Sequence, residues 1–166
     1  KNIESDYSLL SKYTLKYCIE NKKKFVFAWK RDNKYKQGHS NEYNYFKKHL
    51  EKKEFDFLIK NSLLKETSSY SSYKCILQSK VAVSVASSML REKLSMRGRI
   101  LTSNYTSFSY YNFPMKSICV LKKKGYAAFK KRMDYILKLK EKDFANKMRS
   151  NKDYLIKFYK KNDLAN

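Results

Sequence analysis

Apolar and polar residues follow one another in a pattern that predicts alternating helices and buried strands over the first sixty residues. Apolar residues recur at helical spacing over about residues 5–23, and the aromatic-rich run at residues 25–29 predicts a buried strand. A polar, basic stretch that contains a glycine predicts a loop over residues 30–40. A second helix is expected over residues 41–53, followed by a second strand over residues 55–59.

The clearest pattern in the chain begins at residue 71. Residues 71–78 predict a short helix, and residues 81–85 are an apolar run of the kind that fills a parallel sheet covered on both faces. Ser87 and Ser88 are favourable cap residues for another helix, and Gly98 stands where that helix is expected to end.

The remaining residues predict two more strands and two helices. Residues 100–102 begin a strand that leads into a loop rich in tyrosine and serine over residues 103–113. A last short strand is expected over residues 117–121, and helices over residues 126–139 and 142–159.

This order of elements predicts a Rossmann-like α/β fold. We expect a parallel sheet of about five strands with helices on both faces and a C-terminal helical pair. No internal repeat or low-complexity linker divides the chain, so residues 1–166 are predicted to form a single domain. The first residues read as the entry into a helix, and we therefore expect this domain to be the C-terminal half of a longer protein.

The chain is strongly basic, with 38 Lys and Arg residues against 15 Asp and Glu residues and a net charge of +23 at pH 7. Such an excess favours anionic partners: nucleic acid, anionic lipid or nucleotide. Lysine, asparagine, tyrosine and isoleucine are abundant throughout, however, so codon bias with a solvated surface is an equally good explanation.

Several classes of protein find no support in the sequence. No apolar run approaches the ~20 residues that a membrane span needs. The three cysteines are far apart and form no CxxC pair, which predicts buried free thiols and a cytoplasmic location. The carboxylates form no recognisable metal-binding motif, so neither a metal nor a cofactor is expected.

Hydroxyl groups at the start of a helix that follows a buried strand predict an anion site. Ser87 and Ser88 hold this position, where free backbone N–H groups and the positive end of the helix dipole meet. In open α/β sheets, phosphate-bearing ligands bind outside the carboxyl ends of the strands. Both serines are therefore predicted to contact a diphosphate, although simple helix capping also accounts for them.

Residues 79–104 resemble the C-terminal half of GT-B glycosyltransferases, closest to bacterial surface-carbohydrate and capsule-type transferases. The resemblance rests on the spacing Ser-Val-Ala-Ser-Ser-x-x-x-Glu-x-x-x-x-x-Gly-Arg-x-Leu and on the layout of most of the chain. The sequence departs from the family at Lys93, where alanine is common, and it lacks the proline that often follows Gly98 and Arg99.

The resemblance implies a nucleotide-sugar donor, a carbohydrate or lipid-linked acceptor, and no metal. It also implies that Glu92 accepts hydrogen bonds from the ribose hydroxyls of the donor. The N-terminal half of such enzymes usually binds the acceptor and often supplies the catalytic base, so the catalytic residues stay unknown.

Residues outside this segment are predicted to complete the site. Lys30 and Arg31 directly follow a buried strand, where a cation can neutralise the pyrophosphate leaving group. His39 follows in the same loop, and its pKa near neutrality suits phosphate contact or proton transfer. An aromatic group of possible pocket residues is formed by Tyr70, Tyr73 and Tyr105.

Two alternatives stay open at this point. A basic, tyrosine-rich domain can bind nucleic acid, with lysines on phosphates and tyrosines stacked on bases, although the RNA-binding signatures are absent. The basic C-terminal helices can instead hold the protein peripherally at an anionic membrane.

Overall fold

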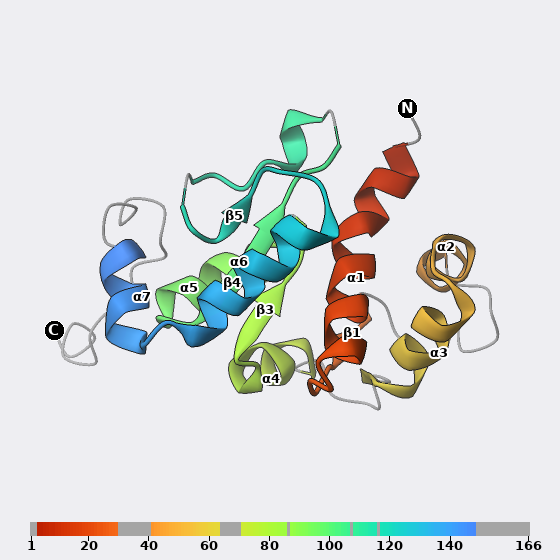
Figure 1. Cartoon of the computed structure of the whole chain (residues 1–166), viewed down its shortest axis with the longest axis horizontal. Coiled ribbons are helices and arrows are strands. Elements are labelled where there is room, and N and C mark those ends of the chain that lie inside the picture. Colours follow the sequence, from red (N-terminus) through yellow and green to blue (C-terminus); the bar gives the residue numbers. More distant parts are fainter. Residues whose placement is uncertain are drawn as a thin grey trace, which may run out of the picture.

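The computed structural model describes residues 3–29, 41–63, 71–85, 87–106, 108–115 and 117–148 of the chain (Figure 1). Its helices are α1 (Ile3–Glu20), α2 (Asn41–His49), α3 (Lys52–Lys60), α4 (Ser71–Gln78), α5 (Ser88–Ser95), α6 (Tyr126–Lys138) and α7 (Glu141–Met148). Its strands are β1 (Phe27–Ala28), β2 (Ser62–Leu63), β3 (Val81–Val83), β4 (Arg99–Ser103) and β5 (Val120–Leu121), and η2 (Ser109–Tyr111) is a 3-10 turn.

The strands form two small parallel sheets in place of the one predicted sheet of about five strands. The larger sheet has the order β3-β4-β5, with Val81 opposite Arg99 and Thr102 opposite Val120. β1 and β2 pair separately. The mixture of helices and parallel strands confirms the α/β class. Within the described residues no ladder joins the two sheets, so the prediction of one five-stranded sheet is wrong.

Residues 55–59 are helical, which contradicts the predicted strand. The helix expected over residues 41–53 ends early, and α3 begins after Glu51. The Glu51 amide donates to a carboxylate oxygen of Glu54 at 3.0 Å, one half of a capping box that starts a new helix. Leu58 is then fully buried one turn after the buried Glu54. The alternation around Phe55 and Phe57 imitates a strand, but the buried positions follow helical spacing.

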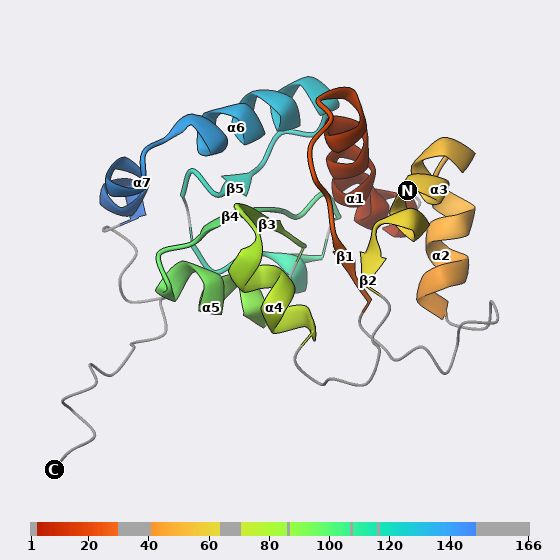
Figure 2. The ribbon, with the colours of Figure 1, turned by 90° about the horizontal axis from the view of Figure 1, so that it is seen from below.

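Helices cover both faces of the three-stranded sheet, as predicted. Figure 2 shows α6 on one side of the sheet and α5 on the other. α5 packs against β3 and β4, while α6 packs against β5 and α1. α6 and α7 correspond to the predicted C-terminal helical pair, up to Met148.

Two hydrophobic clusters share α1. Leu10 and Tyr17 belong to the larger cluster around the three-stranded sheet, and Leu15 belongs to a smaller cluster with Trp29 and Leu58. Because 3.6 residues make one turn, positions 10 and 17 lie on one side of the helix and position 15 on another. α1 is therefore buried on two sides and joins the two parts of the molecule.

Two tyrosine–carboxylate hydrogen bonds tie α1 to α6. The Tyr17 hydroxyl donates to Asp134 at 2.5 Å, and the Tyr126 hydroxyl donates to Glu20. Burial, followed by the neighbouring carboxylate, raises the pKa of both phenols. These bonds place the start of α6 beside the C-terminal half of α1.

α5 ends in a Schellman motif in which the left-handed residue is Arg97, at φ 59°. The Gly98 amide donates to the Lys93 carbonyl at 2.8 Å, and the Arg97 amide donates to the Leu94 carbonyl at 2.9 Å. α1 ends in the same way, with Lys22 at φ 49°. Gly98 was predicted to end the helix; it stands one residue after the left-handed Arg97, and the Lys93 side chain lies close to its Cα.

Replacing Arg97 by glycine is expected to stabilise the fold by about 0.5–1 kcal/mol, because the left-handed conformation is costly for a residue with a Cβ atom. The exposed Arg97 side chain has no hydrogen bond or ion pair in the described residues that would be lost. Chemical denaturation measures the change. Lys22→Gly should give a similar gain, and a loss of stability in both variants would contradict the assignment.

The three cysteines form no disulfide, as predicted. Cys18 and Cys119 are buried, whereas Cys75 is only partly buried. Burial raises the pKa of the Cys18 and Cys119 thiols to about 11, so both remain protonated and unreactive near neutral pH.

Candidate functional site

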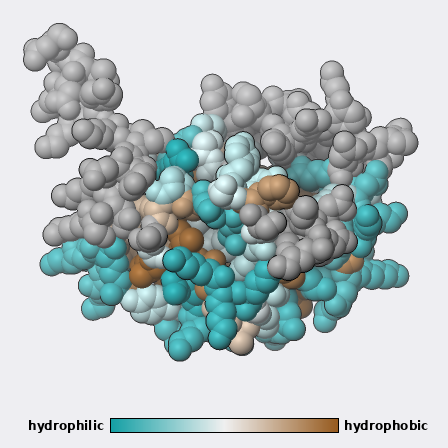
Figure 3. All heavy atoms as spheres, turned by 90° about the horizontal axis from the view of Figure 1, so that it is seen from above, coloured by the Kyte–Doolittle hydropathy of each residue, from teal (hydrophilic) through white to brown (hydrophobic). Residues whose placement is uncertain are grey.

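The carboxyl ends of β3, β4 and β5 point to one end of the molecule (Figure 1). Figure 3 looks onto this end, where the visible surface is mainly hydrophilic and hydrophobic atoms form small separate patches. In parallel α/β sheets ligands bind at this end of the strands. The residues that follow each of the three strands are therefore the candidates for a binding site.

Ser87 and Ser88 follow β3 and begin α5. Ser87 is the N-cap, with an extended backbone, and its side chain makes no capping hydrogen bond. The Ser88 side chain is exposed. The start of α5 therefore keeps backbone N–H donors without a side-chain cap, an arrangement that suits an anion.

β4 ends in two buried hydroxyl groups. Ser103 and Tyr105 are 2% and 6% exposed, and neither hydroxyl meets hydrogen-bond geometry with a protein group. The two groups still interact electrostatically: burial raises the pKa of Tyr105 to about 12, and the Ser103 hydroxyl partly opposes this rise. The Tyr105 ring packs edge-on against Tyr13 of α1, at 6.1 Å between centroids, so Tyr105 is largely a packing residue.

Asn104 organises the loop that follows β4. Its side-chain amide donates to the Phe108 carbonyl at 2.7 Å and to the Asn112 side chain at 2.8 Å, and its oxygen accepts from the Thr106 amide at 3.0 Å. This ordered loop holds Tyr110 85% exposed. The expected aromatic loop therefore exists: Phe108 and Tyr110 are exposed, whereas Tyr105 is buried and Tyr111 packs against the core.

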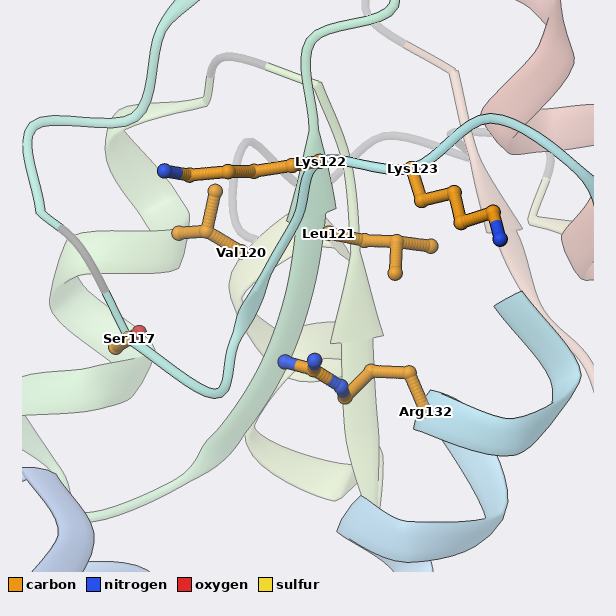
Figure 4. A pocket seen from close by; sticks show the side chains of 6 residues that line it. All are labelled: Ser117, Val120, Leu121, Lys122, Lys123 and Arg132. Atoms are coloured by element: carbon orange, nitrogen blue, oxygen red, sulfur yellow. The ribbon is translucent and has the colours of Figure 1, made fainter. Parts of the chain in front are cut away.

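A cationic cavity of about 360 Å³ lies beside β5. Its lining is Ser117, Val120, Leu121, Lys122, Lys123 and Arg132, without any acidic residue. Figure 4 shows the side chains of Val120 and Lys122 on one side of the chain and those of Leu121 and Lys123 on the other, with Arg132 reaching in from α6. Successive side chains of an extended chain point to opposite sides, which separates the two neighbouring lysines.

The Arg132 side chain is held in this cavity by a hydrogen bond to the backbone of another residue. Its Nη1 donates to the Ile118 carbonyl at 2.6 Å. The remaining N–H donors of the planar guanidinium are the kind that bind phosphate or carboxylate oxygens. The sequence analysis did not single out this cavity, although three consecutive lysines after the predicted strand at residues 117–121 were a visible signal.

Glu92 and Tyr73 are brought together, although they were predicted for different parts of the ligand. The Glu92 carboxylate lies close enough to the Tyr73 hydroxyl to raise the pKa of Tyr73. Tyr73 lies on α4, which leads into the amino end of β3 (Figure 1). The contacts with nucleobase and ribose that were expected of this pair remain predictions.

Two basic residues within residues 79–104 serve the packing. Lys93 is buried, and its Nζ donates to the Ile76 and Ser79 carbonyls at 2.5 Å each. Arg99 donates to the Leu139 carbonyl at 2.7 Å, beyond the end of α6. The Gly-Arg pair of the motif thus has a structural explanation in this chain.

Four of the predicted site residues, Lys30, Arg31, His39 and Tyr70, lie outside the described residues. In the part that is described, no group of three or more His, Cys, Asp or Glu residues could hold a metal ion. Among the described helices, none is long and apolar enough to cross a membrane.

Comparison with known proteins matches almost the whole chain to a protein family. No curated protein and no solved structure matches the sequence. Residues 3–165 match a protein family described as "putative O-antigen biosynthesis protein". A match over this length assigns the chain to a family concerned with surface carbohydrate, and the chain belongs to that O-antigen biosynthesis family.

Proposed function

We propose that this domain binds a nucleotide-diphosphate sugar and acts as the donor-binding half of a glycosyltransferase in O-antigen biosynthesis. Membership of the O-antigen biosynthesis family over residues 3–165 is the observation that carries the proposal. Assembly of a surface polysaccharide requires transfer of sugars, and the resemblance of residues 79–104 to GT-B enzymes names the half that holds the donor.

The polar ends of the strands support this proposal. The donor diphosphate is placed at the start of α5, where Ser87 and Ser88 offer hydroxyl and backbone N–H donors. Lys122 directly follows β5, which lies two strand spacings, roughly 10 Å, from β3, so its positive charge is at the same edge of the sheet. In this arrangement the lysine helps to balance the charge of the bound diphosphate and of the diphosphate leaving group.

A thermal-shift titration with UDP-, GDP-, CDP- and TDP-linked sugars tests the proposal. A ligand that binds only the folded state must raise the unfolding midpoint, and one nucleotide is expected to do so selectively. Ser88→Glu puts a carboxylate at the start of α5, which the helix dipole favours but which repels a diphosphate. This variant should fold normally and bind the donor at least about tenfold more weakly.

Two controls accompany this titration. Asn146→Glu adds the same charge at an exposed position on α7 and should bind as the parent chain does. Glu92→Gln should weaken binding if Glu92 holds the ribose, whereas Tyr73→Phe removes the hydroxyl partner of Glu92 and leaves the carboxylate. A midpoint that rises with single-stranded polynucleotide and with no nucleotide sugar would replace the proposal by nucleic-acid binding.

A further inference from the structure

The largest excess of positive charge in the described structure lies in residues 122–148. These contain ten Lys and Arg residues against three Asp and Glu residues, residues 71–106 contain six against one, and residues 41–63 contain five against four. The excess charge is therefore not spread evenly over the surface, as codon bias alone would leave it. The basic part comprises the end of β5, α6 and α7.

α6 turns opposite sides to the core and to solvent. Phe129, Met133 and Ile136 are buried against the sheet. On the outer side, Lys131, Tyr135 and Lys138 are exposed and follow helical spacing. We call this outer side the basic face of α6; it includes the exposed Lys140, which follows the helix.

The acidic residues nearby leave these lysines largely uncompensated. Asp134 accepts the hydrogen bond of Tyr17 and faces α1. Glu141 and Asp143 lie in the first turn of α7, where the helix dipole favours them. Within the described residues, none of the three lysines of the basic face, Lys131, Lys138 and Lys140, forms an ion pair.

From this distribution we infer that the basic face of α6 docks the protein on an anionic lipid surface. Each lysine near such a surface contributes about 1 kcal/mol, and several side by side give stable but salt-sensitive attachment. Tyr135, which is 40% exposed between Lys131 and Lys138, is the kind of side chain that settles at the boundary between lipid headgroups and water. The convex outer side of a helix of this composition suits the plane of a membrane. Single-stranded nucleic acid instead binds in grooves lined with aromatic rings that stack on its bases.

Lipid docking does not require the donor site at the start of α5. The basic face of α6 includes neither the start of α5 nor Lys122, which together are proposed to hold the donor. A docked domain would keep its donor site near acceptors that are attached to lipid. Loss of docking and loss of donor binding are therefore separate results.

Co-sedimentation with vesicles tests the inference. The chain is expected to sediment with vesicles that contain phosphatidylglycerol and to stay in solution with phosphatidylcholine alone. The double variant Lys131→Glu/Lys138→Glu should bind at least about tenfold more weakly. Lys131→Gln/Lys138→Gln, which removes the charge without reversing it, should show a smaller loss.

A matched control separates the effect of the basic face on vesicle binding from the effect of the total net charge. Lys52→Glu/Lys53→Glu changes the total charge equally, at two exposed positions in the first turn of α3, and should bind vesicles as the parent chain does. Circular dichroism and unfolding midpoints confirm that each variant folds. The inference would be overturned if both Lys→Glu double variants lost vesicle binding equally, or if the parent chain showed no preference for anionic vesicles. It would also be overturned if Lys131 and Lys138 were needed for binding to polynucleotide but not for binding to vesicles.

Discussion

Replacing Phe129 by alanine is expected to destabilise the protein by about 3–5 kcal/mol, a large part of the stability of a domain of this size. Phe129 is fully buried on α6, and its ring lies 5.9 Å from that of Tyr13 and 6.2 Å from that of Tyr17 between centroids. The substitution leaves a cavity between α1, α6 and the sheet, and the tyrosine–carboxylate bonds hinder its collapse.

Urea denaturation followed by circular dichroism measures this loss. Lys131→Ala, at an exposed position of the same helix, is the matched control and should change the stability by less than about 0.5 kcal/mol. A loss for Phe129→Ala no larger than that of the control would mean that α6 does not pack on α1 as described.

A second large effect is expected at Gly98, through its contact with Lys93. A Cβ atom on Gly98 would lie 2.6 Å from both Cδ and Cε of Lys93. Lys93 has little room to move away, because it is 5% exposed and its Nζ is held by two carbonyls. Gly98→Ala should therefore cost about 1–3 kcal/mol, as overpacking typically does.

A double-mutant cycle isolates this contact. Lys93→Ala alone should destabilise the fold by about 2–4 kcal/mol, since it opens a cavity and removes the donor to the Ile76 and Ser79 carbonyls. In that background Gly98→Ala should cost much less than in the parent chain, because the obstructing side chain is gone. Additive effects would show that Gly98 is needed for a reason other than Lys93.

Local patterns in the sequence predicted most of the elements but not how the strands assemble. The helix predicted over residues 71–78 is α4 with the same bounds, and the strands predicted at residues 81–85 and 100–102 are β3 and β4. The error at residues 55–59 arose because Phe55 and Phe57 imitate the alternation of a strand. The capping box at Glu51 and Glu54, which starts α3 there, was not recognised.

The candidate site was predictable where chemistry follows a strand directly. Ser87 and Ser88 stand at the start of α5 as expected. The roles of Lys93 and Arg99 could not be predicted, because their carbonyl partners lie on α4 and beyond the end of α6, which only the tertiary fold brings close. For the same reason the sequence did not reveal that Arg132 of α6 joins Lys122, which follows β5, in one cavity.

An NMR titration of the isotope-labelled chain with the nucleotide-diphosphate sugar selected by thermal shift tests the central claim most directly. If the diphosphate binds at the carboxyl ends of the strands, the amide signals of Ser87, Ser88 and Met89 will shift most, with smaller shifts at Lys122 and Lys123. Saturating donor that leaves these amides unchanged, or shifts confined to the aromatic loop around Tyr110, would contradict the account.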